Sequence, residues 1–221
     1  MPYASHLKFV ASGFLGTAES NGEIFSFGIQ IGNPDGSETG LGTALFWEQL
    51  QTATINFFSS SSTRIHNVAK LTTMKASLID ANGRVVRNPD GSLVQREAAP
   101  PLGPVAGAAS SNLHPYQVAC VVSLDTPRRS RSGRGRLYLP TPGILVGSDG
   151  RIAATDRDTV LTQAETWIEA INSAAGPVNR VIVASSSGVN SPVTAVRVGR
   201  VLDTQRRRRS DLVEDYALRT V

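Results

Sequence analysis

Arginine side chains are the groups in this sequence whose type and spacing offer the clearest chemistry with a partner. The 221-residue chain contains 19 arginines and three lysines and carries a formal net charge of +4. A guanidinium keeps its charge and can form two parallel hydrogen bonds to a carboxylate or a phosphate. Nine of the arginines fall in two clusters, which are Arg128, Arg129, Arg131, Arg134 and Arg136, and then Arg206, Arg207, Arg208 and Arg209.

The two clusters predict contact with an anionic partner, which is either nucleic acid or an acidic face of a neighbouring subunit. The alternative is that both clusters are solvated loops, because short runs of like charge are common on protein surfaces. No acidic residue interrupts residues 128–136. We therefore take the nine arginines as the candidate subunit or nucleic-acid contacts.

The first cluster lies between two strand-like segments. Residues 118–124 are apolar and rich in β-branched side chains, and residues 136–139 alternate between polar and apolar. Residues 125–135 contain a proline, two glycines and four of the five arginines. The pattern predicts a β-hairpin with a long, exposed, cationic tip. Tyr138 could stack on a nucleic-acid base, or it could be a half-buried aromatic of the strand.

Other residue types do not form a recognisable catalytic or metal-binding pattern. His6, His66 and His114 are far apart in the sequence, and residues 183–188 do not match the G-x-S-x-G pattern of a nucleophile elbow. Asp149, Asp156 and Asp158 do not have the spacing of a calcium loop. We therefore expect no catalytic residue, no cofactor and no metal, and predict that the protein is not an enzyme.

The composition is that of a chain with a packed core. Hydrophobic residues make up 40% of the sequence, and no apolar run approaches the roughly 20 residues of a membrane helix. The N-terminus lacks the pattern of a secretory signal, so no membrane partner is expected. The single cysteine, Cys120, lies in an apolar segment and is expected to be a small buried hydrophobe.

The N-terminal half predicts strands joined by glycine-containing turns. Strands are expected at 6–10, 23–31 and 67–80, and a helix at 42–58. The five-residue sequence NPDGS occurs at 33–37 and again at 88–92, and Asn82-Gly83 is a strong hairpin signal. Because the flanks of the two NPDGS segments differ, we interpret them as the same turn chemistry used twice rather than as a repeat.

The C-terminal half contains the clearest helix. Thr155 and Asp158 resemble a capping box at its start, and Gly176 followed by Pro177 marks its end. One face is apolar and is expected to be buried, with Trp167 and Ile168 in the core; its members are Val160, Leu161, Ala164, Trp167, Ile168, Ile171 and Ala175. Strands are expected at 180–184 and 193–202 with a loop between them at 185–192. Gly199 is the expected site of a β-bulge.

These elements predict an α+β fold with a mainly antiparallel β-sheet, one well-defined C-terminal helix and turn-rich connections. Four segments follow from the composition. They are a β-rich part at 1–97, a Pro/Gly/Ala-rich connection at 98–114, a hairpin-helix-hairpin part at 115–205 and a charged tail at 206–221. We expect them to form one compact domain.

The segments QVACVVSLDTP, SGRGRLYLP and VTAVRVGRVLDTQRRRR, together with the helix between them, resemble a group of predicted virion structural proteins of tailed bacteriophages. The resemblance covers residues 115–210, with a weaker match at EIFSFGIQI. It implies a coat, capsid-associated, head-to-tail or tail component located in the virion and, during assembly, in the host cytoplasm. It implies no site residues.

Two functions therefore remain. The first is a non-enzymatic virion structural protein that binds copies of itself as a homo-oligomer, or binds other virion proteins, through its arginine-rich loops. The alternative is a nucleic-acid-binding protein that contacts phosphates through residues 128–136 and 206–209. The two differ in salt response, since phosphate binding weakens steeply as salt rises.

Overall fold

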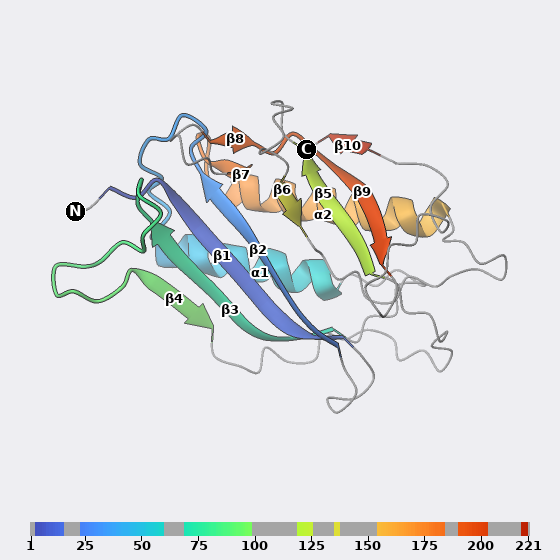
Figure 1. Cartoon of the computed structure of the whole chain (residues 1–221), viewed down its shortest axis with the longest axis horizontal. Helices are drawn as coiled ribbons and strands as arrows, with labels where there is room; N and C mark the ends of the chain where they lie inside the picture. The colour runs from blue at the N-terminus through green and yellow to red at the C-terminus, as the bar shows by residue number, and fades with distance from the viewer. Residues whose placement is uncertain are drawn as a thin grey trace.

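The computed structural model describes residues 3–15, 23–59, 69–98, 119–125, 135–137, 154–183, 190–202 and 218–220. Within these ranges the chain forms two helices and ten strands (Figure 1). In chain order they are β1 (His6–Leu15), β2 (Glu23–Gly32), α1 (Ala44–Ser59), β3 (Ala69–Ile79), β4 (Gln95–Ala98), β5 (Ala119–Asp125), β6 (Gly135–Leu137), α2 (Ala154–Ala174), β7 (Arg180–Val183), β8 (Ser191–Pro192), β9 (Ala195–Leu202) and β10 (Leu218–Thr220).

The strands form two sheets, and all of their pairings are antiparallel. The larger sheet has the order β4-β3-β1-β2-β7-β8, and the smaller one has the order β10-β9-β5-β6. The predicted α+β class with a mainly antiparallel sheet is therefore confirmed. β7 and β8 come from the C-terminal half of the chain and extend a sheet that the N-terminal half begins.

Alternation along the strands gives the six-stranded sheet one buried face. The strands predicted at 6–10 and 23–31 are confirmed as β1 and β2, which are paired along their whole length. Alternating side chains on β1 and β2 are withdrawn from solvent, and β3 follows the same pattern except at one register shift opposite Ser12 and Gly13. The buried members are Phe9, Ala11, Phe27, Ile29, Ile31, Leu71, Met74 and Ala76. The residues between them lie on the opposite face, which we call the open face.

Both helices cover the buried face of this sheet (Figure 1). They are antiparallel, since Thr39 just before α1 lies beside Asn179 just after α2, while Thr54 contacts Trp167 in the middle. Trp167 and Ile168 are almost completely buried, so the predicted core face of α2 is confirmed. The Trp167 ring lies 5.7 Å from that of Phe27 and 5.3 Å from that of Phe57, which joins both helices to the sheet.

The starts of the two helices differ from what their sequences suggested. The helix predicted at 42–58 is α1, and Thr43 caps it by accepting a hydrogen bond from Phe46 N at its Oγ1 (3.2 Å). α2 begins at Ala154, so the predicted capping role of Thr155 is wrong, because Thr155 is already inside the helix. The predicted end of α2 is confirmed, with Gly176 at a φ of 85°.

The four-stranded sheet contains the predicted hairpin. β5 and β6 pair from Val122–Leu137 to Leu124–Gly135. On the other side of β5, Val121 is opposite Arg200 and Val122 is opposite Val198, so Gly199 is the extra residue and the predicted bulge is confirmed. α2 contacts β9 and β10 as well as β7, and it thereby links the two sheets.

One predicted loop contains a short strand. Residues 191–192 were expected to be part of a loop, but Ser191 and Pro192 pair with Val183 and Ile182 as β8. A proline is tolerated there because β8 is the edge of the sheet, where one side of the strand needs no partner.

Candidate functional site

Most of the predicted contact arginines lie outside the described residues. This holds for Arg128, Arg129, Arg131, Arg134, Arg206, Arg207, Arg208 and Arg209, and also for Tyr138 and the 98–114 connection beyond Ala98. Arg136 lies in β6, directly opposite Ser123, and Ser123 is also directly opposite Arg197 of β9. The structure thus brings Arg136 into register with an arginine 61 positions later in the chain.

The two arginine clusters are attached to opposite ends of the four-stranded sheet. Asp125, which precedes the first cluster, pairs with Ala195 at the start of β9. Leu202, which ends β9 and precedes the second cluster, pairs with Ala119 at the start of β5. Seven residues of strand separate these points, a distance of about 20 Å.

A groove on the open face of the six-stranded sheet is the strongest candidate site among the described residues. Its volume is ≈ 910 Å³. Its floor includes a row of directly opposite residues from four strands, which are Gln95 of β4, Ser77 of β3, Lys8 of β1 and Gln30 of β2. Each of the four side chains can donate a hydrogen bond, and one is a cation.

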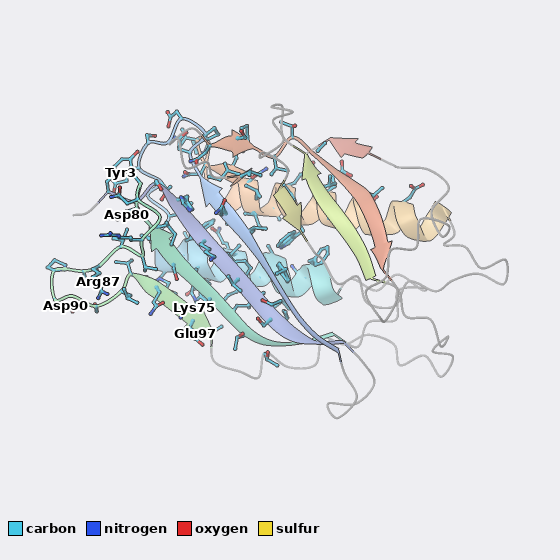
Figure 2. All side chains as sticks on the ribbon, in the orientation of Figure 1. Tyr3, Lys75, Asp80, Arg87, Asp90 and Glu97 are labelled. Carbon is cyan, nitrogen blue, oxygen red and sulfur yellow. The ribbon has the colours of Figure 1, made fainter. Side chains whose placement is uncertain are left out.

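A second row lies two residues further along the strands. It consists of Glu97, Lys75, Val10 and Gly28, again directly opposite one another on β4, β3, β1 and β2. Figure 2 shows Lys75 and Glu97 at the β3–β4 side of the sheet. Lys8 and Lys75 are exposed diagonal neighbours, which places their Cα atoms about 7–8 Å apart.

The turn after β3 forms one end of the groove. The Oδ1 atom of Asp80 accepts hydrogen bonds from the backbone N–H groups of Asn82 (2.8 Å) and Arg84 (2.9 Å). Gly83 has a φ of 77°, which the predicted Asn-Gly turn requires. Because the Asp80 carboxylate accepts hydrogen bonds from two backbone groups of the turn, it holds this wall of the groove in place.

His6 and Ser5 form a polar pair beside this turn. Ser5 Oγ lies 2.8 Å from His6 Nδ1, 3.2 Å from Ile79 O and 3.1 Å from Asp80 O. When the single hydroxyl proton is donated to a carbonyl, His6 Nδ1–H must be the donor to Ser5 Oγ. Burial and, to a smaller extent, the charge of Lys8 lower the pKa of His6, which favours the neutral ring.

The opposite wall is formed by the segment after β2 and by Asn190. Asn190 is buried, and its Nδ2 donates a hydrogen bond to Asn33 O (3.1 Å). Gly36, in the first NPDGS segment, also lines the groove, and its carbonyl accepts a hydrogen bond from the Tyr3 hydroxyl. Residues 157 positions apart in the chain therefore support the same wall.

The two NPDGS segments have the same turn geometry, as their interpretation as repeated turn chemistry predicted. The N–H of Gly36 bonds to Asn33 O (3.0 Å), and the N–H of Gly91 bonds to Asn88 O (2.9 Å). The backbone N–H of the serine bonds to the aspartate Oδ1 in both turns. The side-chain and backbone hydrogen bonds of Ser37 lower the pKa of Asp35, and those of Ser92 lower the pKa of Asp90.

The groove offers hydrogen-bond donors and two ammonium groups, which suits the binding of an anion. Its one serine–histidine contact, Ser5 Oγ to His6 Nδ1, involves a hydroxyl that also lies within hydrogen-bond distance of two backbone carbonyls, Ile79 O and Asp80 O. No group of three potential metal ligands occurs among the residues that the structure describes. Within the same ranges, neither helix is long and apolar enough to cross a membrane.

Lys8 and Lys75 were missed by the sequence analysis, which followed the arginines. Lys8 and Lys75 lie in separate segments, and only the pairing of β1 with β3 makes them neighbours. The available signal was strand alternation, which places Lys8 between the buried Leu7 and Phe9 and Lys75 between Met74 and Ala76.

The fold and the groove define an α+β protein with two antiparallel sheets, two covering helices and a polar sheet face. Comparison with protein-family models, with curated proteins and with solved structures found no match.

Proposed function

We propose that this chain is a non-enzymatic structural component of a bacteriophage particle that assembles with copies of itself or docks onto other virion proteins. What supports the proposal is the resemblance of three segments of the sequence to predicted virion proteins of tailed phages. The two most extended of these segments contain β5 and β9, which are neighbours in one sheet. The resemblance therefore falls on two segments that are far apart in the sequence but adjacent in the fold.

Both edges of the six-stranded sheet carry features that oppose pairing with another strand. β4 has four residues and exposes Arg96 and Glu97, and β8 has two residues, one of which is Pro192. Short edge strands with charges or proline discourage edge-to-edge association. This supports an assembly whose contacts are made by loops and faces rather than by extension of this sheet.

The described segment that best suits contact with a neighbour is the arm at residues 80–94. Hydrogen bonds hold the arm together and join it to β3. They run from Val86 N to Leu78 O (2.8 Å) and from Val94 N to Val86 O (2.8 Å). Residues 87–92 at its tip are all exposed, and Figure 2 shows Arg87 and Asp90 there, beyond the end of the sheet. The arm is thus an ordered projection held by backbone hydrogen bonds.

Size-exclusion chromatography with light scattering, run with and without nuclease, tests the proposal. We expect a homo-oligomer whose number of protein subunits does not change after nuclease treatment. Charge reversal of Arg128, Arg129, Arg131 and Arg134 to glutamate should shift the oligomer to smaller species, because these arginines are proposed to bind an acidic edge of the next subunit.

Substitution of the same four arginines by lysine is the matched control, since it retains the charge and removes the planar guanidinium. A nuclease-resistant oligomer that survives charge reversal would contradict the role of this cluster. A monomer that carries no nucleic acid would contradict the proposed function as a whole. A mass that falls only on nuclease treatment would favour the alternative, a nucleic-acid-binding protein.

A further inference from the structure

We propose that the open face of the six-stranded sheet binds the phosphate backbone of single-stranded nucleic acid. This inference goes beyond the proposed function and uses residues that neither arginine cluster contains. It rests on the groove that includes Lys8, Lys75, Gln30, Ser77 and Gln95.

The Cα atoms of the donor residues are held at fixed spacings because they belong to paired strands. Neighbouring strands are about 4.8 Å apart, so the row from Gln95 to Gln30 spans about 15 Å across four strands. The second row lies about 7 Å further along the strands. A preorganised array of this kind avoids the loss of conformational freedom that flexible loops suffer when they bind.

The charges of the groove favour an anion over a cation. Lys8 and Lys75 line it, and the one acid in the lining, Asp80, already accepts two backbone hydrogen bonds at its Oδ1. Lys8 is flanked by Ser77 and Gln30, so neither of its directly opposite neighbours is an acid. Lys75 is flanked by Val10 and Glu97. The two ammonium groups repel each other across adjacent strands, and an anion placed between them would relieve that repulsion.

The types of the lining residues favour phosphates over bases. Lysine, serine, glutamine and asparagine are common donors to phosphate oxygens, and all four types line the groove. His6 is the one aromatic residue in the lining and it is buried, so the groove does not expose a ring face on which bases could stack. We therefore expect binding that depends on the backbone of the nucleic acid and hardly on its sequence.

The size of the groove favours a single strand over a duplex or a small molecule. A volume of ≈ 910 Å³ lies at the upper end of the range for pockets that hold small ligands. Such a groove can hold a short stretch of single strand. A duplex holds its phosphates on a stiff, wide scaffold, whereas a single strand can bend to follow the donors of the two rows, so we expect the single strand to bind more tightly.

The experiment is fluorescence anisotropy of the full chain with a labelled oligothymidylate, measured over a range of salt concentrations. The variant Lys8→Gln/Lys75→Gln should bind more weakly at low salt. The slope of log Kobs against log salt should fall by about 1.4, since each lost contact with a single-strand phosphate contributes about 0.7. Lys8→Arg/Lys75→Arg should retain the slope.

The matched control is Gln49→Glu/Thr162→Glu, which lowers the net charge by the same two units at exposed positions on α1 and α2. It should bind almost as the unaltered protein does. Equal losses in the two variants would mean a general charge effect and would overturn the proposal. An unchanged slope in the Lys8→Gln/Lys75→Gln variant would overturn it too, and would assign any binding to the arginine clusters.

If the Lys8→Gln/Lys75→Gln variant does not fold, a second variant tests whether the open face binds nucleic acid. Glu97→Gln removes the exposed acid directly opposite Lys75 and should tighten binding about two- to fivefold. Unchanged or weaker binding would overturn the proposal. A duplex of the same length should bind more weakly than the single strand. Light scattering on the same samples shows whether oligomerisation, and with it the proposed function, is retained independently.

Discussion

Trp167 Nε1 donates a hydrogen bond of 3.4 Å to Thr54 Oγ1, and this contact joins the two helices inside the core. Thr54 Oγ1 in turn donates a bond of 2.8 Å to Leu50 O. Both side chains are buried, so the hydroxyl satisfies two polar groups that water does not reach.

Replacement of Thr54 by valine should therefore destabilise the protein by about 1–3 kcal/mol, because the buried indole N–H loses its acceptor while the shape of the side chain is kept. Urea unfolding at constant pH measures the effect. Thr54→Ser should recover most of the loss. Thr52→Val, at an exposed position of the same helix, is the control and should change the free energy of unfolding by less than about 0.5 kcal/mol. An equal effect at both positions would contradict the assignment.

Gly32 is the position on β2 where a side chain has least room. An added Cβ would lie 2.9 Å from Ser5 O and 2.9 Å from His6 Cβ. Gly32→Ala should thus destabilise the protein by about 1–3 kcal/mol, as overpacking usually does. Gly42→Ala is the comparison, since its Cβ would meet only the flexible end of Leu78 at 3.3 Å. In thermal unfolding, the midpoint temperature of Gly32→Ala should be clearly lower than that of Gly42→Ala.

His6 should make stability depend on pH near neutrality. Its folded-state pKa lies below the ordinary value of 6.5, so the unfolded chain binds more protons as the pH falls. The contribution is complete above pH 6.5 and is lost as the pH falls from there through the folded-state pKa. Urea midpoints of the protein and of His6→Gln, measured between pH 8 and pH 5, should converge as the pH is lowered. A constant difference would show that His6 does not titrate in this range.

The two NPDGS turns, at 33–37 and 88–92, share the hydrogen bond from the serine N–H to the aspartate Oδ1, so each can serve as the control for a substitution in the other. Ser92→Ala removes the side-chain hydrogen bond of 2.6 Å from Ser92 Oγ to Asp90 Oδ1, so the pKa of Asp90 should rise towards 3.8 while that of Asp35 stays lowered. Ser37→Ala should raise the pKa of Asp35 alone. NMR titration of the aspartate side chains measures both. If one variant shifted both carboxyl groups, the two turns would not be independent.

Local patterns predicted much of the fold. Alternation in β2 and the helical spacing in α2 each identify a buried face from a single stretch of sequence, because the geometry of a strand or helix depends on its own backbone. Gly199 is similar, since the phase change between Val198 and Val201 is visible in the sequence. The start of α2 was predicted less well, because the helix begins at Ala154, before Thr155, the residue that the capping pattern placed at its start.

The sequence by itself determined which residues of each strand and helix face the core. Only the tertiary structure decided which strands are neighbours, and with that the site. Gln95, Ser77, Lys8 and Gln30 belong to four separate segments, and they form a row because β4, β3, β1 and β2 lie in that order. The physical reason is that alternation assigns a residue to a face, whereas strand order and register are set by packing the whole buried face against α1 and α2.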